Sequence, residues 1–143
     1  MQDATFLEKP VFFHSYSSVG GKTESEGPLG KSFDFIDESD LFGMKTFERA
    51  EGEMSRIAVN MALKKGKLSP DCLSLMVSGD LQNQCVASSG GLFTFGVPYI
   101  GLYGACSTCT ESLIVLSSMM SCSEKYKMGC AVTSSHKIGR AHV

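Results

Sequence analysis

The spacing of apolar positions changes along the chain, and it predicts where helices and strands form. Between residues 46 and 65 the apolar residues recur every three or four positions, as on one face of an amphipathic helix. Gly66 is expected to end this helix as its left-handed C′ residue. Residues 73–77 form a short apolar run closed by Ser78-Gly79, which is typical of a buried strand.

The later part of the chain continues this alternation. We expect helices over residues 84–95 and 107–121, and strands over residues 98–103 and 129–133. A further strand is predicted at residues 10–13, where Val and Phe favour a pleated surface. The resulting order β-α-β-α-β-α-β predicts an α/β fold with a mostly parallel sheet and helices on both faces.

This pattern divides the chain into an N-terminal region and a core region. Residues 1–45 are expected to hold the first strand and a long loop, since Gly and Pro are frequent between residues 20 and 30 and residues 34–40 are acidic. Residues 46–136 are expected to form the core. A loop of this length inside a compact domain is often functional.

Composition narrows the class of protein. The 143 residues are 43% hydrophobic and 20% charged, which is typical of one globular domain. The net charge of −2 gives no electrostatic footprint for nucleic acid. The first residues carry no signal-peptide pattern, and the apolar stretch at residues 113–120 is too short to span a bilayer, so we expect an intracellular protein.

Residues that could take part in binding or catalysis follow the predicted strands. In parallel sheets, sites lie at the carboxyl ends of strands, and Gly79-Asp80, Cys106 and His136 all fall at that edge. A cysteine at the start of a helix faces unpaired N–H groups, which favours a reactive thiolate, although a buried free cysteine is the common alternative. Asp80 and Asn83 either cap the local backbone or line a pocket. His136 is either held in place by a hydrogen bond or part of the site.

The six cysteines allow two other interpretations, neither of which we favour. Cys106 and Cys109 form a C-x-x-C pair, but a redox pair normally has a thioredoxin-like context with a downstream proline, and none follows Pro98. A zinc site needs a second ligand pair, and Cys122 and Cys130 are eight residues apart. We therefore expect no metal and no cofactor.

Four separated motifs carry a resemblance to a known family. They are Gly27-Pro28-Leu29-Gly30, the segment from Gly79 to Gln84, Tyr103-Gly104-Ala105-Cys106-Ser107-Thr108, and Thr133-Ser134-Ser135-His136. Together with Glu111, their order and spacing resemble the stage V sporulation protein AD family, from about Pro10 to His136. The pattern stops after His136, so residues 137–143 are expected to be a non-native tail and the natural protein to continue.

The resemblance implies a fold and a function. Members of this family resemble thiolases, which are built from two similar halves, and this chain matches the first half. It would bind dipicolinic acid, pyridine-2,6-dicarboxylate, with calcium as a candidate bridging ion, and would support its uptake into the forespore. Other stage V sporulation membrane proteins are the expected partners, at the periphery of the inner spore membrane, and an oligomer is compatible with this role. The expected ligand-binding residues are Cys106, Ser107, Asn83, His136 and Asp80.

The resemblance leaves one alternative open. Cys106 matches the position where thiolase-like enzymes accept an acyl group, so an acyltransferase or condensing enzyme is the competing function. Such an enzyme needs a base and an oxyanion hole, commonly supplied from the second half of the fold. Half of such a fold would also expose apolar surface, which predicts poor solubility for this chain alone.

Overall fold

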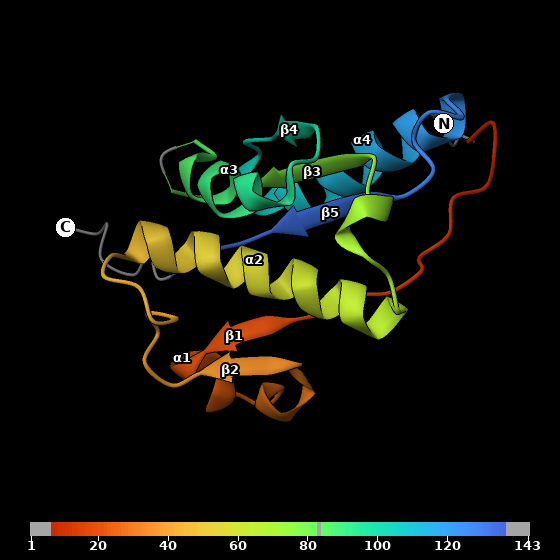
Figure 1. The fold of residues 1–143 in the computed structure, drawn as a ribbon. Coiled ribbons are helices and arrows are strands. Elements are labelled where there is room, and N and C mark those ends of the chain that lie inside the picture. The colour runs from red at the N-terminus through yellow and green to blue at the C-terminus, as the bar shows by residue number, and fades with distance from the viewer. Residues whose placement is uncertain (1–6, 83, 137–143) are drawn as a thin grey trace, which may run out of the picture.

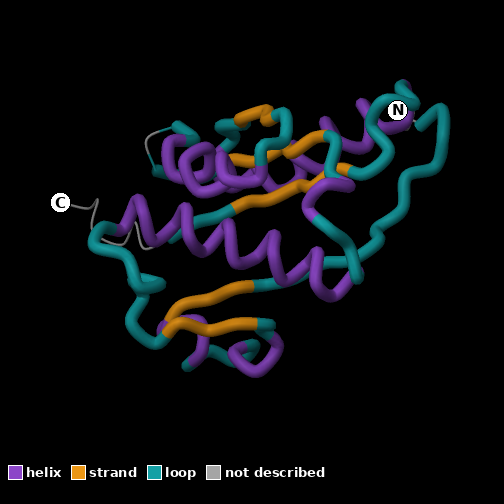
Figure 2. Tube along the Cα trace, in the orientation of Figure 1, coloured by secondary structure: helices purple, strands orange, loops and turns teal. Residues whose placement is uncertain are grey.

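The structure is a computed structural model that describes residues 7–82 and 84–136, and it has parallel strands in two sheets (Figures 1 and 2). The strands are β1 (Val19–Gly21), β2 (Phe35–Asp37), β3 (Leu75–Gly79), β4 (Tyr99–Gly101) and β5 (Gly129–Thr133). The α-helices are α1 (Lys22–Ser25), α2 (Phe47–Gly66), α3 (Val86–Leu92) and α4 (Thr108–Cys122). Short 3-10 turns lie at Gly30–Ser32, Pro70–Cys72, Phe93–Phe95 and Ala105–Ser107. The predicted α/β class is confirmed.

The main sheet has the strand order β4-β3-β5, and all of its pairs are parallel. Met76 of β3 lies opposite Tyr99 of β4 on one side and Cys130 of β5 on the other. The three later strands predicted from the sequence are therefore confirmed. β5 has the predicted bounds, whereas β3 begins at Leu75 rather than residue 73.

The prediction for the N-terminal region is wrong in two respects. Residues 10–13 belong to no strand, and Phe12 and Phe13 are each 81% exposed. The first strand is β1, which pairs in parallel with β2 in a separate two-stranded sheet. Residues 35–37, taken as part of an acidic loop, form that partner strand. Strands of three residues are too short to show an alternating pattern, so the sequence carried little signal for them.

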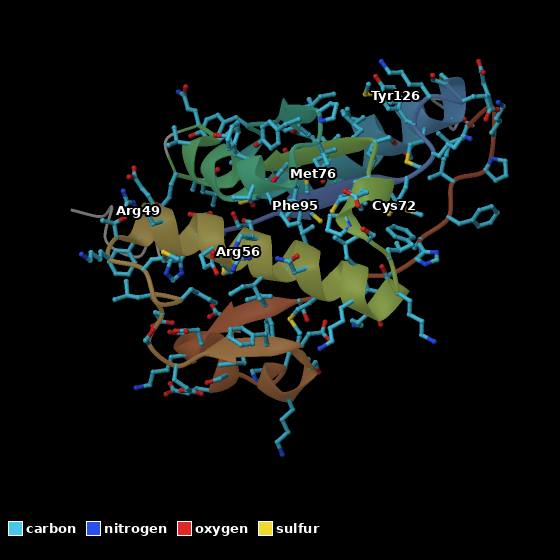
Figure 3. The ribbon with its side chains drawn as sticks, in the orientation of Figure 1. Arg49, Arg56, Cys72, Met76, Phe95 and Tyr126 are labelled. Atoms are coloured by element: carbon cyan, nitrogen blue, oxygen red, sulfur yellow. The ribbon has the colours of Figure 1, made fainter. Side chains whose placement is uncertain are left out.

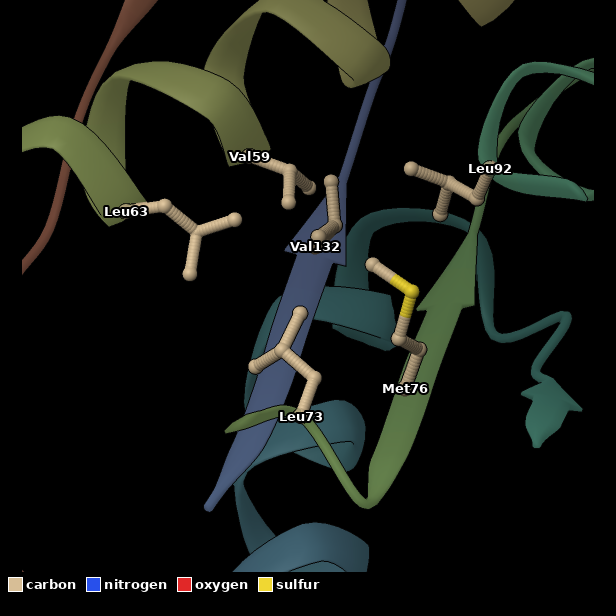
Figure 4. Close-up of a cluster of buried hydrophobic side chains, with 6 residues drawn as sticks. All are labelled: Val59, Leu63, Leu73, Met76, Leu92 and Val132. Carbon is tan, nitrogen blue, oxygen red and sulfur yellow. The ribbon is translucent and has the colours of Figure 1, made fainter. Parts of the chain in front are cut away.

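Helices cover both faces of the main sheet, as predicted. Helix α2 lies between the two sheets in Figure 1, with α3 beside it, and α4 lies on the opposite face of the main sheet. Figure 4 shows the core on the α2 side, where side chains from α2, α3, β3 and β5 meet. Its members are Val59, Leu63, Leu73, Met76, Leu92 and Val132. On the other face, Leu75 and Val77 pack against Leu116 of α4.

The ends of α2 are set by local chemistry. The Thr46 side chain caps the first turn by accepting a hydrogen bond from the Arg49 N–H at 3.3 Å. The predicted C′ role of Gly66 is wrong, because Gly66 is still helical and Lys67 takes the left-handed conformation with φ 53°. A Cβ on Gly66 would lie 2.9 Å from both His14 and Ser15, so this glycine admits the N-terminal segment instead.

The α2–α3 crossing explains why a run of poor helix formers is helical. A Cβ on Gly91 would lie 2.1 Å from the Gly52 carbonyl oxygen, and one on Gly52 would lie 2.8 Å from the Ala87 carbonyl oxygen. The two backbones therefore touch at a point where a side chain does not fit. Close packing outweighs the low helix propensity of glycine here, and the helix predicted around residues 84–95 is confirmed.

Candidate functional site at the carboxyl edge of the sheet

The segments that follow β3, β4 and β5 meet around Gly79. The Leu102 N–H donates to the Ser78 carbonyl at 2.8 Å, and the Ser134 N–H donates to the Gly79 carbonyl at 3.3 Å. A Cβ on Gly79 would lie 2.1 Å from the Leu102 carbonyl oxygen and 2.7 Å from a methyl of Thr108. This glycine is therefore needed for the close approach that builds the edge. The start of α2 lies on the same side of the molecule as the tips of β3 and β5 (Figure 1).

Cys106 lies in an exposed turn at this edge. It belongs to the 3-10 turn Ala105–Ser107, two residues before α4 begins, whereas the sequence predicted a place at the first helical position. Ala105 has φ 51°, a left-handed conformation that is uncommon for a residue with a Cβ. Within the described residues, the Cys106 thiol makes no hydrogen bond, so it is open to solvent and to a ligand.

The turn around Cys106 is fixed by its neighbours. The Ser107 hydroxyl donates to the Gly104 carbonyl at 2.6 Å and also contacts the Glu111 carboxylate. The Gly104 N–H donates to the Thr108 hydroxyl at 3.1 Å. A Cβ on Gly104 would lie 2.2 Å from both Glu111 carboxylate oxygens, so a side chain at this point would displace the Glu111 carboxylate.

Asp80 is buried, at 1% exposure, and both of its carboxylate oxygens accept backbone hydrogen bonds. One oxygen accepts from the Gln82 N–H at 2.8 Å and the other from the Ser88 N–H at 2.7 Å. Asp80 thus closes the turn after β3 and caps the first turn of α3. Burial raises the pKa of the nearby Cys85 thiol, and the Asp80 charge adds to this rise.

His136 is largely buried, at 5% exposure. Its ring is 5.8 Å from the Phe42 ring, nearly perpendicular to it, and 5.5 Å from the Phe47 ring, measured between centroids. Its Nε2 atom makes a short hydrogen bond with the Asp40 carbonyl, and its own carbonyl accepts from the Gln82 amide at 3.3 Å. The last bond joins the segments after β5 and β3.

The structure brings only some of the predicted site residues together. Asp80 and His136 are linked through Gln82, whereas no hydrogen bond among the described residues joins them to Cys106 or Ser107. Asn83 lies outside the described residues. The carboxyl edge therefore has two parts: the buried Asp80 and His136 on the α2 side, and the exposed turn around Cys106 on the α4 side.

Glu51 is a site residue that sequence reasoning missed. A charged residue within an amphipathic helix is expected to face solvent, yet Glu51 is fully buried, and its carboxylate accepts a hydrogen bond from the Ser134 hydroxyl at 2.9 Å. Burial raises the pKa of Glu51, and the Asp80 carboxylate adds to the rise. Its spacing of four residues from Ser55 and eight from Val59, both buried, was the available signal.

A polar hollow of about 310 Å³ lies between β1 and the segment after β5. Its walls include Gly20-Gly21, Asp40 and residues 134–136. The Asp40 carboxylate accepts a hydrogen bond from the Lys22 N–H at 2.7 Å, and the Glu24 carboxylate accepts one from the Gly21 N–H at 3.0 Å. Both carboxylates therefore stabilise the start of α1. Across residues 7–82 and 84–136, no group of three or more His, Cys, Asp or Glu side chains is arranged to hold a metal ion.

Comparison with known proteins gives two findings. The family model described as stage V sporulation protein AD matches residues 1–141. A curated relative, "Stage V sporulation protein AD" of Bacillus subtilis (strain 168), is 36% identical over 130 residues, which cover 91% of this chain and 38% of the relative. The chain thus spans well under half the length of that relative. No helix in the described part of the chain has the length and apolar character needed to cross a membrane.

Proposed function

Because this chain belongs to the stage V sporulation protein AD family, we propose that it binds dipicolinic acid and supports the uptake of this dianion into the forespore. The ligand has a planar pyridine ring with two carboxylates. A site for it needs hydrogen-bond donors or a cation for each carboxylate and little uncompensated negative charge nearby.

The observation that carries the proposal is the exposed turn at the carboxyl edge beside a buried acidic residue whose charge is already satisfied. Cys106 presents an exposed thiol, and Ser107 holds the turn by donating its hydroxyl hydrogen to the Gly104 carbonyl. Asp80 directs both of its oxygens to N–H groups, so it is not left free to repel an anion.

A cation is available at the same end of the molecule. Arg49 lies in the first turn of α2, the end of that helix which faces the carboxyl edge (Figures 1 and 3). A guanidinium can hold a carboxylate through two parallel hydrogen bonds. Arg49 is therefore a candidate carboxylate partner on the α2 side of this edge, on the face opposite α4.

Titration calorimetry of the full-length protein with dipicolinate, with and without calcium, tests this function. Pyridine-2-carboxylate and pyridine are the matched ligands, since they remove one and both carboxylates. We expect affinity to fall in the order dipicolinate, monocarboxylate, pyridine. No measurable dipicolinate binding in either buffer would overturn the proposal, and equal affinity for dipicolinate and pyridine would show that the carboxylates are not recognised.

The cellular role is part of the same proposal. We place the protein at the periphery of the inner spore membrane, working with other stage V sporulation membrane proteins. Crosslinking in sporulating cells, followed by identification of the adducts, tests this role. Recovery of membrane proteins of the same stage supports it, and recovery of none contradicts it.

Exposed Cys106 favours one second candidate, acyl transfer. The Cys106 thiol would lose its proton and attack the carbonyl carbon of an acyl-CoA thioester, forming a new thioester while the bond to the CoA sulfur breaks; CoA leaves as a thiolate that takes up the proton given up by Cys106. Intact-mass measurement of the full-length protein after incubation with acyl-CoA decides this. An acyl adduct that disappears in Cys106→Ala supports the enzyme, and its absence contradicts it.

A further inference from the structure

Glu51 connects two parts of the carboxyl edge that are far apart in sequence. It lies in the second turn of α2 and accepts the Ser134 hydroxyl hydrogen bond, which reaches across 83 residues to the segment after β5. Ser134 is itself tied to β3 through its N–H and the Gly79 carbonyl. The helix, the central strand and the segment leading to His136 are thereby fixed in one arrangement.

The second oxygen of the Glu51 carboxyl group is unusual. Oε2 is buried and makes no hydrogen bond with any described residue. Burying an ionised carboxylate costs much more than burying a neutral carboxylic acid, unless donors satisfy both oxygens. Asp80 in the same region accepts two N–H hydrogen bonds, whereas Glu51 accepts one from a hydroxyl, with the Gln82 amide and the His136 N–H acting on it more weakly. The unpartnered oxygen of Glu51 is therefore suited to hold a proton.

We propose that Glu51 is a positioning residue of the dianion site, and that in its neutral, protonated form it holds the Ser134–His136 segment against α2. This inference rests on the proposed function, since it identifies a group that prepares the site for a dianion. A neutral Glu51 removes one negative charge from the neighbourhood of the ligand and keeps an acceptor for Ser134.

Electrostatics agrees with this geometry. Burial raises the pKa of Glu51 most, and repulsion from Asp80 raises it further. The Ser134 hydroxyl, the Gln82 amide and the His136 N–H act in the opposite direction by favouring the ionised form. The titratable or charged side chains on α2 and on the elements packed around Glu51 include Glu24, Asp40, Glu48, Arg49, Glu53, Arg56, Asp80, Cys85, Tyr99, Cys130 and His136.

The sign of the pH effect follows from the raised pKa. Between the ordinary value and the raised value, the folded state holds a proton that the unfolded state has lost, so stability falls as pH rises through this window. Glu51→Gln is neutral at every pH and keeps the acceptor oxygen. The melting temperature of Glu51→Gln minus that of the wild type should therefore increase from about pH 5 upward.

The test measures melting temperature and dipicolinate affinity of the full-length protein from about pH 5 to about pH 9, for wild type, Glu51→Gln and the control Glu53→Gln. Glu53 lies on the same helix and pairs with Arg56 at the surface side. Wild-type affinity should fall by roughly tenfold across the window, as ionised Glu51 repels the dianion, while Glu51→Gln stays nearly constant. Glu53→Gln should follow the wild type.

A Ser134→Ala variant covers the case in which Glu51→Gln fails to fold. Losing a hydrogen bond that favours the ionised form should move the midpoint of the pH dependence upward. If the melting temperatures of the wild type and Glu51→Gln change with pH in parallel, the inference is overturned. It is also overturned if the midpoint of the pH dependence is the same in Ser134→Ala as in the wild type. If the wild type binds no dipicolinate at any pH, the proposed function fails, and the melting profiles still decide the state of Glu51.

Discussion

At the scale of single residues, the carboxyl edge depends on how its acidic side chains are satisfied. Asp80 and Glu51 are both buried, but their partners differ in kind: backbone N–H groups for the first and a serine hydroxyl for the second. This difference gives Asp80 a structural role at the start of α3 and leaves one oxygen of Glu51 without a hydrogen bond to any described residue.

Replacing Asp80 should therefore cost stability in proportion to the acceptors that are lost. Asp80→Ala leaves two buried N–H groups without partners and removes a helix cap, so we expect a loss of about 3 kcal/mol. Asp80→Asn keeps one acceptor oxygen and should cost about half as much. Thermal or denaturant unfolding of the full-length protein measures both, and equal effects would contradict the two-acceptor account.

Two residue-level features of the site were hidden in the sequence. The charge of Glu51 favours a place on the solvent face, whereas the structure buries it with Ser55. The left-handed Ala105 before Cys106 gave no signal, because nothing in its side chain favours φ above zero. By contrast, Asp80, Cys106 and His136 were correctly placed after strand ends.

At the scale of elements, the strongest local constraint is the contact between α2 and α3. Gly91 meets the Gly52 backbone directly, whereas a Cβ on its neighbour Gly90 would find nothing within 4 Å. Gly91 therefore has no room for a side chain, whereas its neighbour Gly90 does.

Alanine substitutions at the two positions should have opposite effects. Gly91→Ala drives a methyl group into the Gly52 carbonyl and should destabilise the protein by about 1–3 kcal/mol. Gly90→Ala should stabilise it by about 0.5–1 kcal/mol, because alanine is the better helix former at an open position. Unfolding measurements on both variants decide this, and a stabilising Gly91→Ala would contradict the close crossing.

The predictability of each element followed the strength of its periodic signal. The 20 residues of α2 and the 15 of α4 repeat the helical spacing for several turns, and β3 and β5 are short apolar runs between clear turns. β1 and β2 have three residues each, so no pattern could reveal them. Their pairing depends on contacts between segments, which a local pattern does not contain.

At the scale of the whole molecule, one apolar groove is left open. It has a volume of about 580 Å³ and runs along β5, between residues 11–17 and the helices α2 and α4. β5 is the last strand in its sheet, and Phe12, Phe13 and Tyr16 are between 76% and 81% exposed. An apolar surface of this kind favours association.

The 143 residues expressed alone should therefore self-associate. Sedimentation velocity over a range of concentrations measures this. A Phe12→Ser, Phe13→Ser double variant should reduce the association, whereas Phe93→Ser, at a position 85% exposed and outside the groove, should not. A monomeric wild-type chain that melts cooperatively would contradict the prediction.

The central claim is that the dianion binds at the carboxyl edge, against the turn that carries Cys106. Cysteine alkylation tests it within one molecule, because Cys72 and Cys122 are also exposed but lie at the other end of the strands, before β3 and at the end of α4. The rates of modification of these three thiols, and of Cys109, which is also exposed and lies in the first turn of α4, are followed in the full-length protein by mass spectrometry with and without saturating dipicolinate. We predict that dipicolinate slows alkylation of Cys106 at least severalfold and leaves Cys72 and Cys122 unchanged. An unchanged rate at Cys106 under saturating ligand would contradict the account.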